Sequence, residues 1–420
     1  MTNRKKLLND PVYGFISISS PLLFDLIEHP YFQRLRRIKQ LGLSEYVYPG
    51  ALHTRFHHAL GAMHLMGQAT ATLCSKGHQL SEAECEAAQI AILLHDIGHG
   101  PFSHVLECCI LEDVHHEQIS LMLMHDLNRQ FGGALSLAIQ MFEGTYPRPF
   151  FHQLISSQLD MDRMDYLNRD CFYTGVAEGA IGAERIIKML DLADDQLVVE
   201  DKGILSVENF LNARRLMYWQ VYLHKTSICC ESMLVQILRR ARFLARNPDI
   251  GHEPIDALPD FMLFLRGTIS LTDFMSDTTY LQAFTHLDDY DIWGCVKAWA
   301  NHSDLVLATL CRMLLDRHLF KIMLSTEPFA PTLVDELAQQ LRSKGLSDDE
   351  LSYFLVEGQA SNAAYLPAID SIRIKSKNGY VRDIADASDL ANIGALSTIV
   401  RRHYICWARE LAWEAKAKQV

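Results

Sequence analysis

The feature that most constrains this sequence is an apolar run at residues 87–94, which ends directly before His95 and Asp96. Seven of these eight residues are apolar, and Ser81 with Glu84 forms the capping-box signature of a helix start. A helix that is apolar almost all round is buried in a protein core. A buried carboxylate is costly unless a metal or a partner stabilises it. The sequence therefore predicts a core helix whose carboxyl end presents Asp96 to a partner.

Residues 95–104 are rich in side chains that bind metals, with three histidines and one aspartate in ten positions. Glycines and a proline in the same segment end the helix and let the backbone approach a ligand closely. Earlier in the chain, a helix capped by Thr54 offers a further imidazole from His57 or His58. The alternative interpretation is structural, with these polar side chains hydrogen-bonded within the core.

Two later segments carry polar residues at helical spacing. In the first, Asp162, Tyr166 and Asp170 fall on one stripe at i, i+4 and i+8. The spacing does not choose between Asp160 and Asp162 as a ligand. In the second, one stripe contains Arg214, Tyr218, Tyr222 and Lys225. Cations and aromatic rings at this spacing suit phosphate and sugar contacts, whereas the alternative interpretations are a solvated face or packing at the core edge.

The wider pattern predicts a mainly α protein of two parts, because 420 residues exceed one average domain. Residues 1–240 are predicted as one helical unit and residues 241–420 as a mostly helical C-terminal extension. The β signals are a short strand at 15–19 and hairpins at 197–207 and 372–384. A long helix is expected to start near Asn209.

Composition argues against several classes of protein. The formal net charge of -12 disfavours general binding of nucleic acid. Ten cysteines occur without a CxxC pair, which argues against a disulfide framework or a zinc ribbon and fits reduced thiols in the cytoplasm. Neither a signal-peptide core nor a run of about 18 apolar residues occurs. We therefore expect a cytoplasmic protein without a membrane span.

Taken together, these segments resemble the HD-domain dNTP triphosphohydrolases, including the catalytic core of the vertebrate members that carry a sterile-alpha-motif domain. The resemblance rests on residues 9–11 with 32–42, 49–61, 95–104 and 162–170, with a weaker match at 214–225. The combination is specific although an HD dipeptide alone is not. The resemblance implies an HD-domain helical bundle, with the phosphohydrolase core in 1–240 and an oligomerisation or regulatory part in 241–420.

The resemblance also implies roles for individual residues. The metal ligands would be His58, His95, Asp96 and Asp162. The nucleotide-binding residues would be Gln40, Arg55, Arg163, Tyr166, Asp170, Arg214 and Tyr222. The catalytic group would comprise His104 as the general acid, with His99, His116, Glu117 and Asp96. The implied reaction is hydrolysis of a dNTP at its α-phosphorus to a deoxynucleoside and inorganic triphosphate.

Partners and cofactors follow from the same resemblance. It implies a homodimer or homotetramer and a guanine-nucleotide activator site at Asn9, Glu28, Gln33 and Arg36. Glu28 departs from the shorter carboxylate of the family, and Arg163 replaces a lysine, which keeps the charge but changes the geometry. The mixed histidine and carboxylate set suits iron, manganese, zinc or nickel, and magnesium less well. The competing hypotheses are hydrolysis of another phosphoester, such as a monophosphate, a cyclic nucleotide or an alarmone, and a nucleotide sensor without catalysis.

Overall fold

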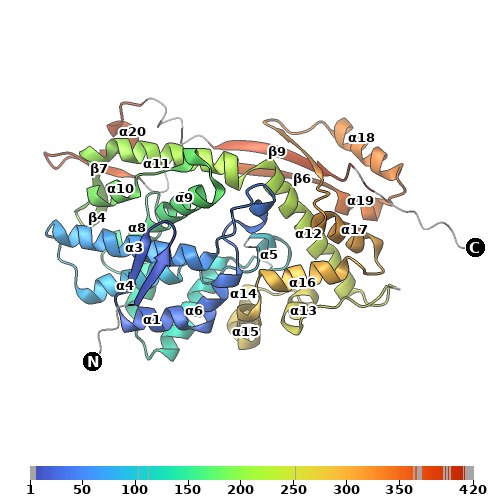
Figure 1. Cartoon of the computed structure of the whole chain (residues 1–420), viewed down its shortest axis with the longest axis horizontal. Helices are drawn as coiled ribbons and strands as arrows, with labels where there is room; N and C mark the ends of the chain where they lie inside the picture. The colour runs from blue at the N-terminus through green and yellow to red at the C-terminus, as the bar shows by residue number, and fades with distance from the viewer. Residues whose placement is uncertain are drawn as a thin grey trace, which may run out of the picture.

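The computed structural model is mainly α-helical, which confirms the predicted fold class. It describes residues 6–102, 104–111, 113–250, 252–362, 365–366, 371–390, 393, 396, 399–409 and 411, without the side chains of residues 104, 107 and 108. In Figure 1 helices α3, α4 and α8 to α11 lie at one end of an elongated molecule and α16 to α19 lie at the other, while α20 returns to the end that holds α10 and α11.

The first half of the chain consists of β1 (Lys6–Asp10), β2 (Gly14–Ile18), α1 (Pro21–Glu28), α2 (Pro30–Gln33), α3 (Arg55–Ser75), α4 (Glu82–Leu94), α5 (His104–Cys109), α6 (His116–Gln130), α7 (Ser136–Phe142), α8 (Phe150–Ile155), α9 (Met161–Thr174), α10 (Ala183–Met189), β3 (Leu190–Ala193) and β4 (Gln196–Glu200). The second half consists of α11 (Ile204–Met217), α12 (Lys225–Arg246), α13 (Pro259–Arg266), α14 (Leu271–Ser276), α15 (Thr278–His286), α16 (Asp289–Trp299), α17 (Leu305–Leu315), β5 (Lys321–Ser325), α18 (Pro331–Arg342), α19 (Asp348–Phe354), β6 (Leu355–Asn362), β7 (Arg373–Lys375), β8 (Val381–Asp383), α20 (Ile384–Ala387) and β9 (Val400–Trp407).

The core helix α4 begins and ends where the sequence predicts. The Ser81 side chain accepts from the Glu84 backbone at 3.2 Å, and the Glu84 carboxylate accepts from the Ser81 backbone at 2.8 Å. The seven apolar residues of the 87–94 run are all buried. Helix α3 packs closely along α4, because a Cβ at Gly67 would lie only 2.5 Å from the Gln89 side chain. These two helices carry the predicted ligands His58 and His95 to one place.

The hairpin predicted at 197–207 is wrong, and the reversal lies one strand earlier. Strand β3 pairs with β4 through a turn in which Asp194 and Asp195 both have positive φ, at 51° and 56°. A two-residue hairpin needs such left-handed residues, and aspartate tolerates them. Residues 201–203 instead form a 3₁₀ turn, and α11 begins at Ile204, ahead of the expected start near Asn209.

The stripe predicted over residues 214–225 does not run along one continuous α-helix. Helix α11 ends at Met217, a π-helical turn follows at Tyr218–Tyr222, and α12 begins at Lys225. Arg214 and Tyr222 therefore come from different local structures. Wider turns of this kind are frequent at functional sites because they redirect side chains.

The other predicted strands are confirmed. Strand β2 covers residues 14–18 and pairs antiparallel with β1. Strands β7 and β8 form the second predicted hairpin around Gly379, whose φ of 85° suits glycine. Strand β7 also pairs in parallel with β4, so this hairpin lies against the first half of the chain, as Figure 1 shows. A separate sheet of the C-terminal region has the order β5-β9-β6.

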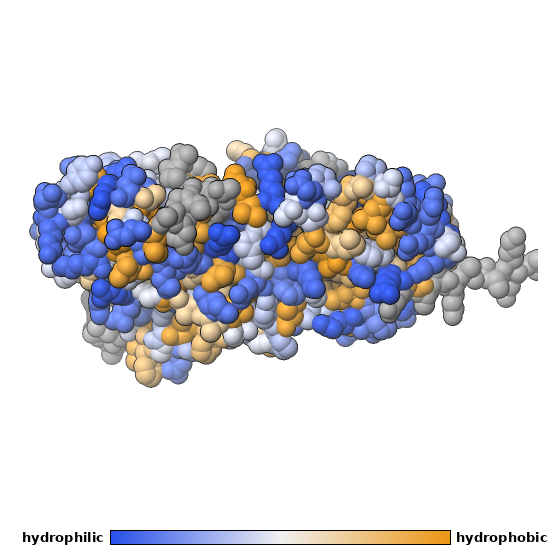
Figure 2. Space-filling view, turned by 90° about the horizontal axis from the view of Figure 1, so that it is seen from above, coloured by the Kyte–Doolittle hydropathy of each residue, from blue (hydrophilic) through white to orange (hydrophobic). Residues whose placement is uncertain are grey.

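The surface mixes apolar and polar side chains. Figure 2 shows hydrophobic residues interspersed with hydrophilic ones across one face of the molecule. Among the residues that the structure describes, no helix combines the length and the apolar character that crossing a lipid bilayer requires.

Candidate metal centre

Three of the predicted ligands converge on one point inside the helical core. His58 comes from α3, His95 follows the last residue of α4, and Asp162 lies in the first turn of α9. The Nε2 atoms of His58 and His95 lie 3.1 and 3.4 Å from Oδ1 of Asp162 and 3.4 Å from each other. A cation with bonds of about 2.1 Å holds neighbouring ligands roughly 3.0–3.4 Å apart. The group therefore has the dimensions of a metal site.

The bonds behind the two imidazoles fix the direction of their lone pairs. Nδ1 of His95 lies 2.7 Å from the Ile92 carbonyl, which can only accept, so this nitrogen carries the proton. Nδ1 of His58 lies 2.8 Å from the Asp165 carboxylate and donates in the same way. Both Nε2 atoms then turn lone pairs toward each other and toward the Asp162 carboxylate. Such an arrangement repels itself unless a second proton on one imidazole or a metal cation lies between the atoms.

The electrostatics of the site favour positive charge at this point. Burial lowers the pKa of His58, but the hydrogen bonds and charges of Asp162 and Asp165 outweigh it and raise the pKa to about 10. Burial opposes ionisation of Asp162 as well, yet the two imidazoles hold its pKa far below the ordinary value. Without a metal, a proton on Nε2 of His58 supplies this positive charge, and a divalent cation held by the same atoms would take its place.

Asp96 borders this group and joins it to Arg55. Its Oδ1 lies 3.4 Å from Nε2 of His95, and its Oδ2 lies 3.8 Å from Nε2 of His58. The Arg55 guanidinium donates a short hydrogen bond to Oδ2. The structure thus brings all four predicted ligands together, with Asp96 further from His58 than Asp162 is.

The candidates that spacing left open have other partners. Nδ1 of His57 accepts from the N-cap backbone of its own helix at 3.2 Å, so the ring stays at the start of α3. Asp160 caps α9 and accepts from the Arg163 backbone at 2.7 Å. Only His58 and Asp162 of these pairs lie in the converging group.

A second cluster of the same residue types lies on the other side of Asp96. Nε2 of His99 is 3.4 Å from Oδ1 of Asp96, and the His99 ring stacks on the His116 ring with 3.7 Å between centroids and 16° between planes. Stacked rings point their lone pairs side by side, so a cation about 2.1 Å from both nitrogens would lie far out of both ring planes. This cluster suits proton transfer better than metal binding.

The protonation of the second cluster is set by its surroundings. Burial and the Arg55 guanidinium hold the pKa of His99 well below its usual value, so this imidazole is neutral. His116 and Glu117 form the first turn of α6. His104 opens α5, but its side chain lies outside the described residues.

The predicted nucleotide residues on α9 and the π-helical turn contact one another. Asp170 is buried and accepts from the Tyr222 hydroxyl at 2.7 Å. The Tyr166 and Tyr222 rings meet edge to face with centroids 5.9 Å apart. Asp162, Tyr166 and Asp170 all lie on α9, and the last two contact Tyr222 of the π-helical turn.

Several buried polar atoms of this region have no hydrogen-bond partner within the part of the chain that the structure describes. They are Oε1 of Gln40, Nε of Arg163 and Nε of Arg214. Arg163 pairs with Asp160 through Nη1, and Arg214 donates to Gln158 through Nη1 at 3.1 Å. Buried polar groups are normally paired, so the two arginine N–H groups could donate to an anionic ligand and the Gln40 oxygen could accept from a hydroxyl group of the same ligand.

Sequence reasoning missed three residues that hold this region together. Nε2 of His53 lies 2.7 Å from Oδ1 of Asp170, and the His53 ring stacks on Tyr173 with centroids 4.4 Å apart. His53 belongs to the matching segment 49–61, but the resemblance gave it no role. Asp165 and Arg169 form a buried ion pair behind His58. Their i, i+4 spacing was the only local signal for the pair.

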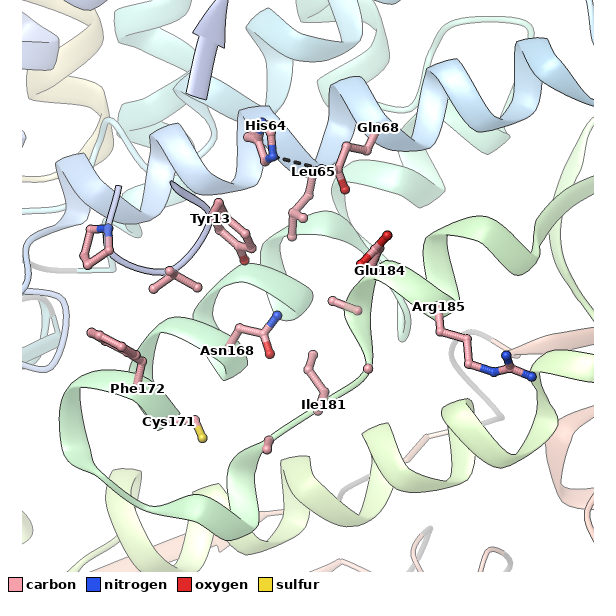
Figure 3. Close-up of a pocket in the computed structure, with 15 residues that line it drawn as sticks. Tyr13, His64, Leu65, Gln68, Asn168, Cys171, Phe172, Ile181, Glu184 and Arg185 are labelled. Carbon is pink, nitrogen blue, oxygen red and sulfur yellow. Dashed lines mark hydrogen bonds between the residues drawn. The ribbon is translucent and has the colours of Figure 1, made fainter. Parts of the chain in front are cut away.

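A cavity between α3, α9 and the start of α10 is not lined by any of the predicted site residues. Its volume is about 810 Å³. Figure 3 shows its walls, which come from the turn after β1, from α3 and α9, and from the start of α10, with Tyr13, His64, Asn168 and Glu184 around the space. The cavity shares two helices with the metal centre but opens onto different side chains.

The four predicted activator residues have local contacts instead. Asn9 pairs with Phe15 in the first hairpin, and Glu28 ends α1. Gln33 donates to a backbone carbonyl of α1 at 2.7 Å and accepts from Arg36 at 2.8 Å.

Helix-borne histidines and aspartates around one point define the HD class of helical hydrolases. The chain belongs to the HD-domain phosphohydrolase family: the HD domain model matches residues 55–170, and the model of the HD associated region matches residues 181–268. HD domains are metal-dependent, which agrees with the geometry of the site.

Some relatives are similar to this chain over most of its length, and others over about half of it. A solved phosphohydrolase from Bacteroides thetaiotaomicron VPI-5482 is 53% identical, with a TM-score of 0.92 over 96% of this chain and all of that one. The uncharacterized protein YwfO of Bacillus subtilis (strain 168) is 32% identical over 92% of this chain and 88% of its own length. The deoxynucleoside triphosphate triphosphohydrolase SAMHD1 of Homo sapiens is 31% identical over 56% of this chain and 44% of its own length.

Proposed function

We propose that this chain hydrolyses deoxynucleoside triphosphates to a deoxynucleoside and inorganic triphosphate with a divalent metal. The observation that carries the proposal is the convergence of two imidazoles and a carboxylate, together with Arg163 and Arg214, whose buried Nε atoms have no partner among the described residues. The sequence similarity to human SAMHD1, whose name states this activity, supports the choice of substrate class. The two arginines Arg163 and Arg214 favour a polyphosphate over a monophosphate.

The donor set fits a transition metal. His58, His95, Asp96 and Asp162 would hold it, and nitrogen with carboxylate ligands suits iron, manganese, zinc or nickel, with magnesium fitting less well. When bound, such a cation polarises a phosphoryl oxygen and lowers the pKa of water. Asp165 and Ile92 keep the two imidazoles in the tautomer that binds it.

The protein's own residues bind and orient the nucleotide. Arg55, Arg163 and Arg214 would neutralise charge on the triphosphate in its transition state. Gln40 and Asp170 would contact the 3′-hydroxyl, Tyr222 would pack on the sugar where it would crowd a 2′-hydroxyl, and Tyr166 would also lie next to the nucleotide. The hydrogen bond from Tyr222 to Asp170 holds both side chains for this contact.

The second cluster would handle the proton that the leaving 5′-oxygen requires. His104 would donate it, because imidazole titrates near neutrality. The stacked pair of His99 and His116, next to Glu117, would return a proton to it. A neutral His99 suits this relay, since it can accept at one nitrogen while it donates at the other.

Product analysis tests the proposal directly. The full chain, with its metal content determined, is incubated with each of the four dNTPs, and nucleoside and triphosphate are measured by chromatography. Triphosphate release is the expected result. Phosphate released only from a monophosphate, a cyclic nucleotide or an alarmone would replace the proposal by another phosphoester, and tight nucleotide binding without turnover would point to a sensor.

The remaining parts of the proposal concern organisation. Residues 1–240 are proposed as the catalytic core and residues 241–420 as the part that forms a homodimer or homotetramer, although α12 runs across residue 240. A guanine nucleotide is proposed to activate at Asn9, Glu28, Gln33 and Arg36. A GTP dependence of the rate and the mass in solution test these points. The described cysteines carry free thiols, which supports a cytoplasmic location.

A further inference from the structure

A buried row of charges runs from the back of His58 into the protein. The His58 ring donates from Nδ1 to Asp165 at 2.8 Å. The Arg169 guanidinium grips the Asp165 carboxylate with two hydrogen bonds, from Nε and Nη2, each of 3.0 Å. The side chains of all three residues are fully buried. A two-point contact between planar groups fixes both the position and the rotation of the carboxylate.

The row continues to the N-terminal turn. Nη1 of Arg169 donates to Oδ2 of Asp10 at 2.8 Å. The other oxygen of Asp10 accepts from the backbone N–H groups of Val12 and Tyr13, each at 2.9 Å. The turn that this carboxylate shapes forms one wall of the cavity in Figure 3. One continuous set of hydrogen bonds therefore connects a cavity wall with a ligand of the metal centre.

The absence of a side chain at Gly61 leaves room for this row beside α3. A Cβ at Gly61 would lie 1.9 Å from Oδ1 of Asp165 and 2.2 Å from Nη2 of Arg169. Helix α3 therefore needs a glycine here, one turn after His58, to let the ion pair lie against it. The absence of a side chain at residue 61 is part of the geometry that holds the imidazole.

Stability alone gives a poor reason for such a row. Replacing a buried ion pair by apolar residues is often neutral or stabilising, because the charges must be removed from water. A carboxylate behind a metal-binding histidine, in contrast, fixes the tautomer and the ring orientation and makes the ligand more basic. The row ends on Nδ1 of His58, whose Nε2 lies in the converging group.

We propose that Asp165, Arg169 and Asp10 are positioning residues that set the metal affinity of His58, so that the turn at residues 10–13 is a working part of the metal centre. This inference rests on the metal centre proposed above. The row acts in sequence: Asp10 and Arg169 hold the Asp165 carboxylate, and Asp165 holds the His58 ring with its Nε2 lone pair toward the cation.

The test measures binding of Co²⁺ alone to the full-length chain, by competition with a chelator and by the visible absorption of the bound ion. Arg169→Met frees the Asp165 carboxylate, so it is expected to weaken Co²⁺ binding by up to the roughly 10–100-fold that loss of an outer-shell partner costs, and to shift the absorption bands. Arg169→Lys keeps the charge but not the two-point contact, and should recover part of the affinity. Circular dichroism at the same temperature verifies that each variant is folded.

Two milder variants keep the proposal testable if Arg169→Met does not fold. Asp10→Asn retains the oxygen that accepts from Val12 and Tyr13, removes only the charge facing Arg169, and should weaken binding by a smaller factor than Arg169→Met. Gly61→Ala removes no charged group but collides with the ion pair, and should weaken binding as well.

Arg240→Met is the matched control. Arg240 grips Asp304 with Nε and Nη2 in a partly buried pair that includes none of the site residues. This variant should lower the melting temperature and leave the Co²⁺ affinity unchanged. The proposal that the row sets the metal affinity is overturned if all row variants bind Co²⁺ within about twofold of the unmodified chain and differ from it only by a lower melting temperature. No Co²⁺ binding by the unmodified chain would overturn the metal centre itself.

Discussion

The two clusters that meet at Asp96 contain the same kinds of residue but differ in what they can bind. In the first, His58 and His95 come from helices, and bonds at Nδ1 turn both Nε2 atoms to one point. In the second, His99 follows α4 in a loop, and its ring lies flat on His116. By residue type and spacing, both clusters could hold a metal. The bond at the far nitrogen of each imidazole aims its lone pair, and on this ground we expect the first cluster to bind the cation.

The largest expected effect comes from removing a ligand of the first cluster. Asp162→Ala should weaken metal binding by more than about 100-fold, beyond the loss of an outer-shell partner, and reduce triphosphate release to background. Both imidazoles approach this one carboxylate oxygen. Metal analysis after dialysis and chromatography of the products measure the two losses. Asp126→Ala, which removes a carboxylate that bonds Tyr31, is the control. Stoichiometric metal in Asp162→Ala would contradict the assignment of the first cluster.

The second cluster should respond differently to the same kind of change. His116→Gln is expected to keep the metal and to lower the rate by about 10²–10⁴-fold, the usual contribution of general acid–base catalysis. The loss should change the pH dependence of the rate as well. If His116→Gln instead loses metal as Asp162→Ala does, then the stacked pair binds a cation and the contrast between the clusters fails.

The loop that carries His99 depends on the C-terminal region for its shape. Asp289 accepts from the backbone N–H of Phe102 and of Lys39, each at 2.8 Å, and Phe102 has a φ of 50°. Asp289→Ala would leave two buried donors unpaired, at about 1–3 kcal/mol each. We expect a lower melting temperature and a reduced rate with the metal retained, measured by thermal unfolding, product release and metal analysis. Loss of metal in this variant would show that the loop also supports the first cluster.

Local signals predicted the parts of the fold that depend on neighbouring residues. The capping box at Ser81 and the turn at Gly379 each need only a few positions, and both are present in the structure. The turn at Asp194 and Asp195 lacks a glycine, so the stronger turn signal at residues 201–203 misplaced the hairpin. The π-helical turn after Met217 has no such local signature.

The candidate site likewise contains residues that the sequence indicated and residues that only the structure revealed. The resemblance chose His58 and Asp162 over their neighbours, a choice that the spacing left open. It gave no role to Asp165, whose partner His58 is 107 positions away. A contact of that separation depends on how α3 packs on α9, and Gly61 allows that packing through the absence of a side chain. A single sequence indicates neither.

The smallest expected effect lies at the amino end of α4, the helix that leads to both clusters. Burial opposes ionisation of Glu84, but hydrogen bonds from Ser81 and Arg148 lower its pKa to about 2. The folded pKa is below the value of 4.5 that an unperturbed glutamate has, so this carboxylate stabilises the fold above pH 4.5, and the stabilisation is lost as the pH falls toward 2.

Glu84→Gln should therefore lower the free energy of unfolding at pH 7 by about 0.5–2 kcal/mol, as loss of a helix cap does. Urea unfolding at pH 7, 4.5 and 2.5 measures this change. The difference in unfolding free energy between the variant and the unmodified chain should shrink as Glu84 becomes protonated. Metal affinity and rate should stay unchanged, because the ligands lie at the opposite end of the helix. A loss of metal in this variant would mean that general loosening of α4 is enough to disperse the first cluster, and the assignments drawn from ligand variants would then need the same stability correction.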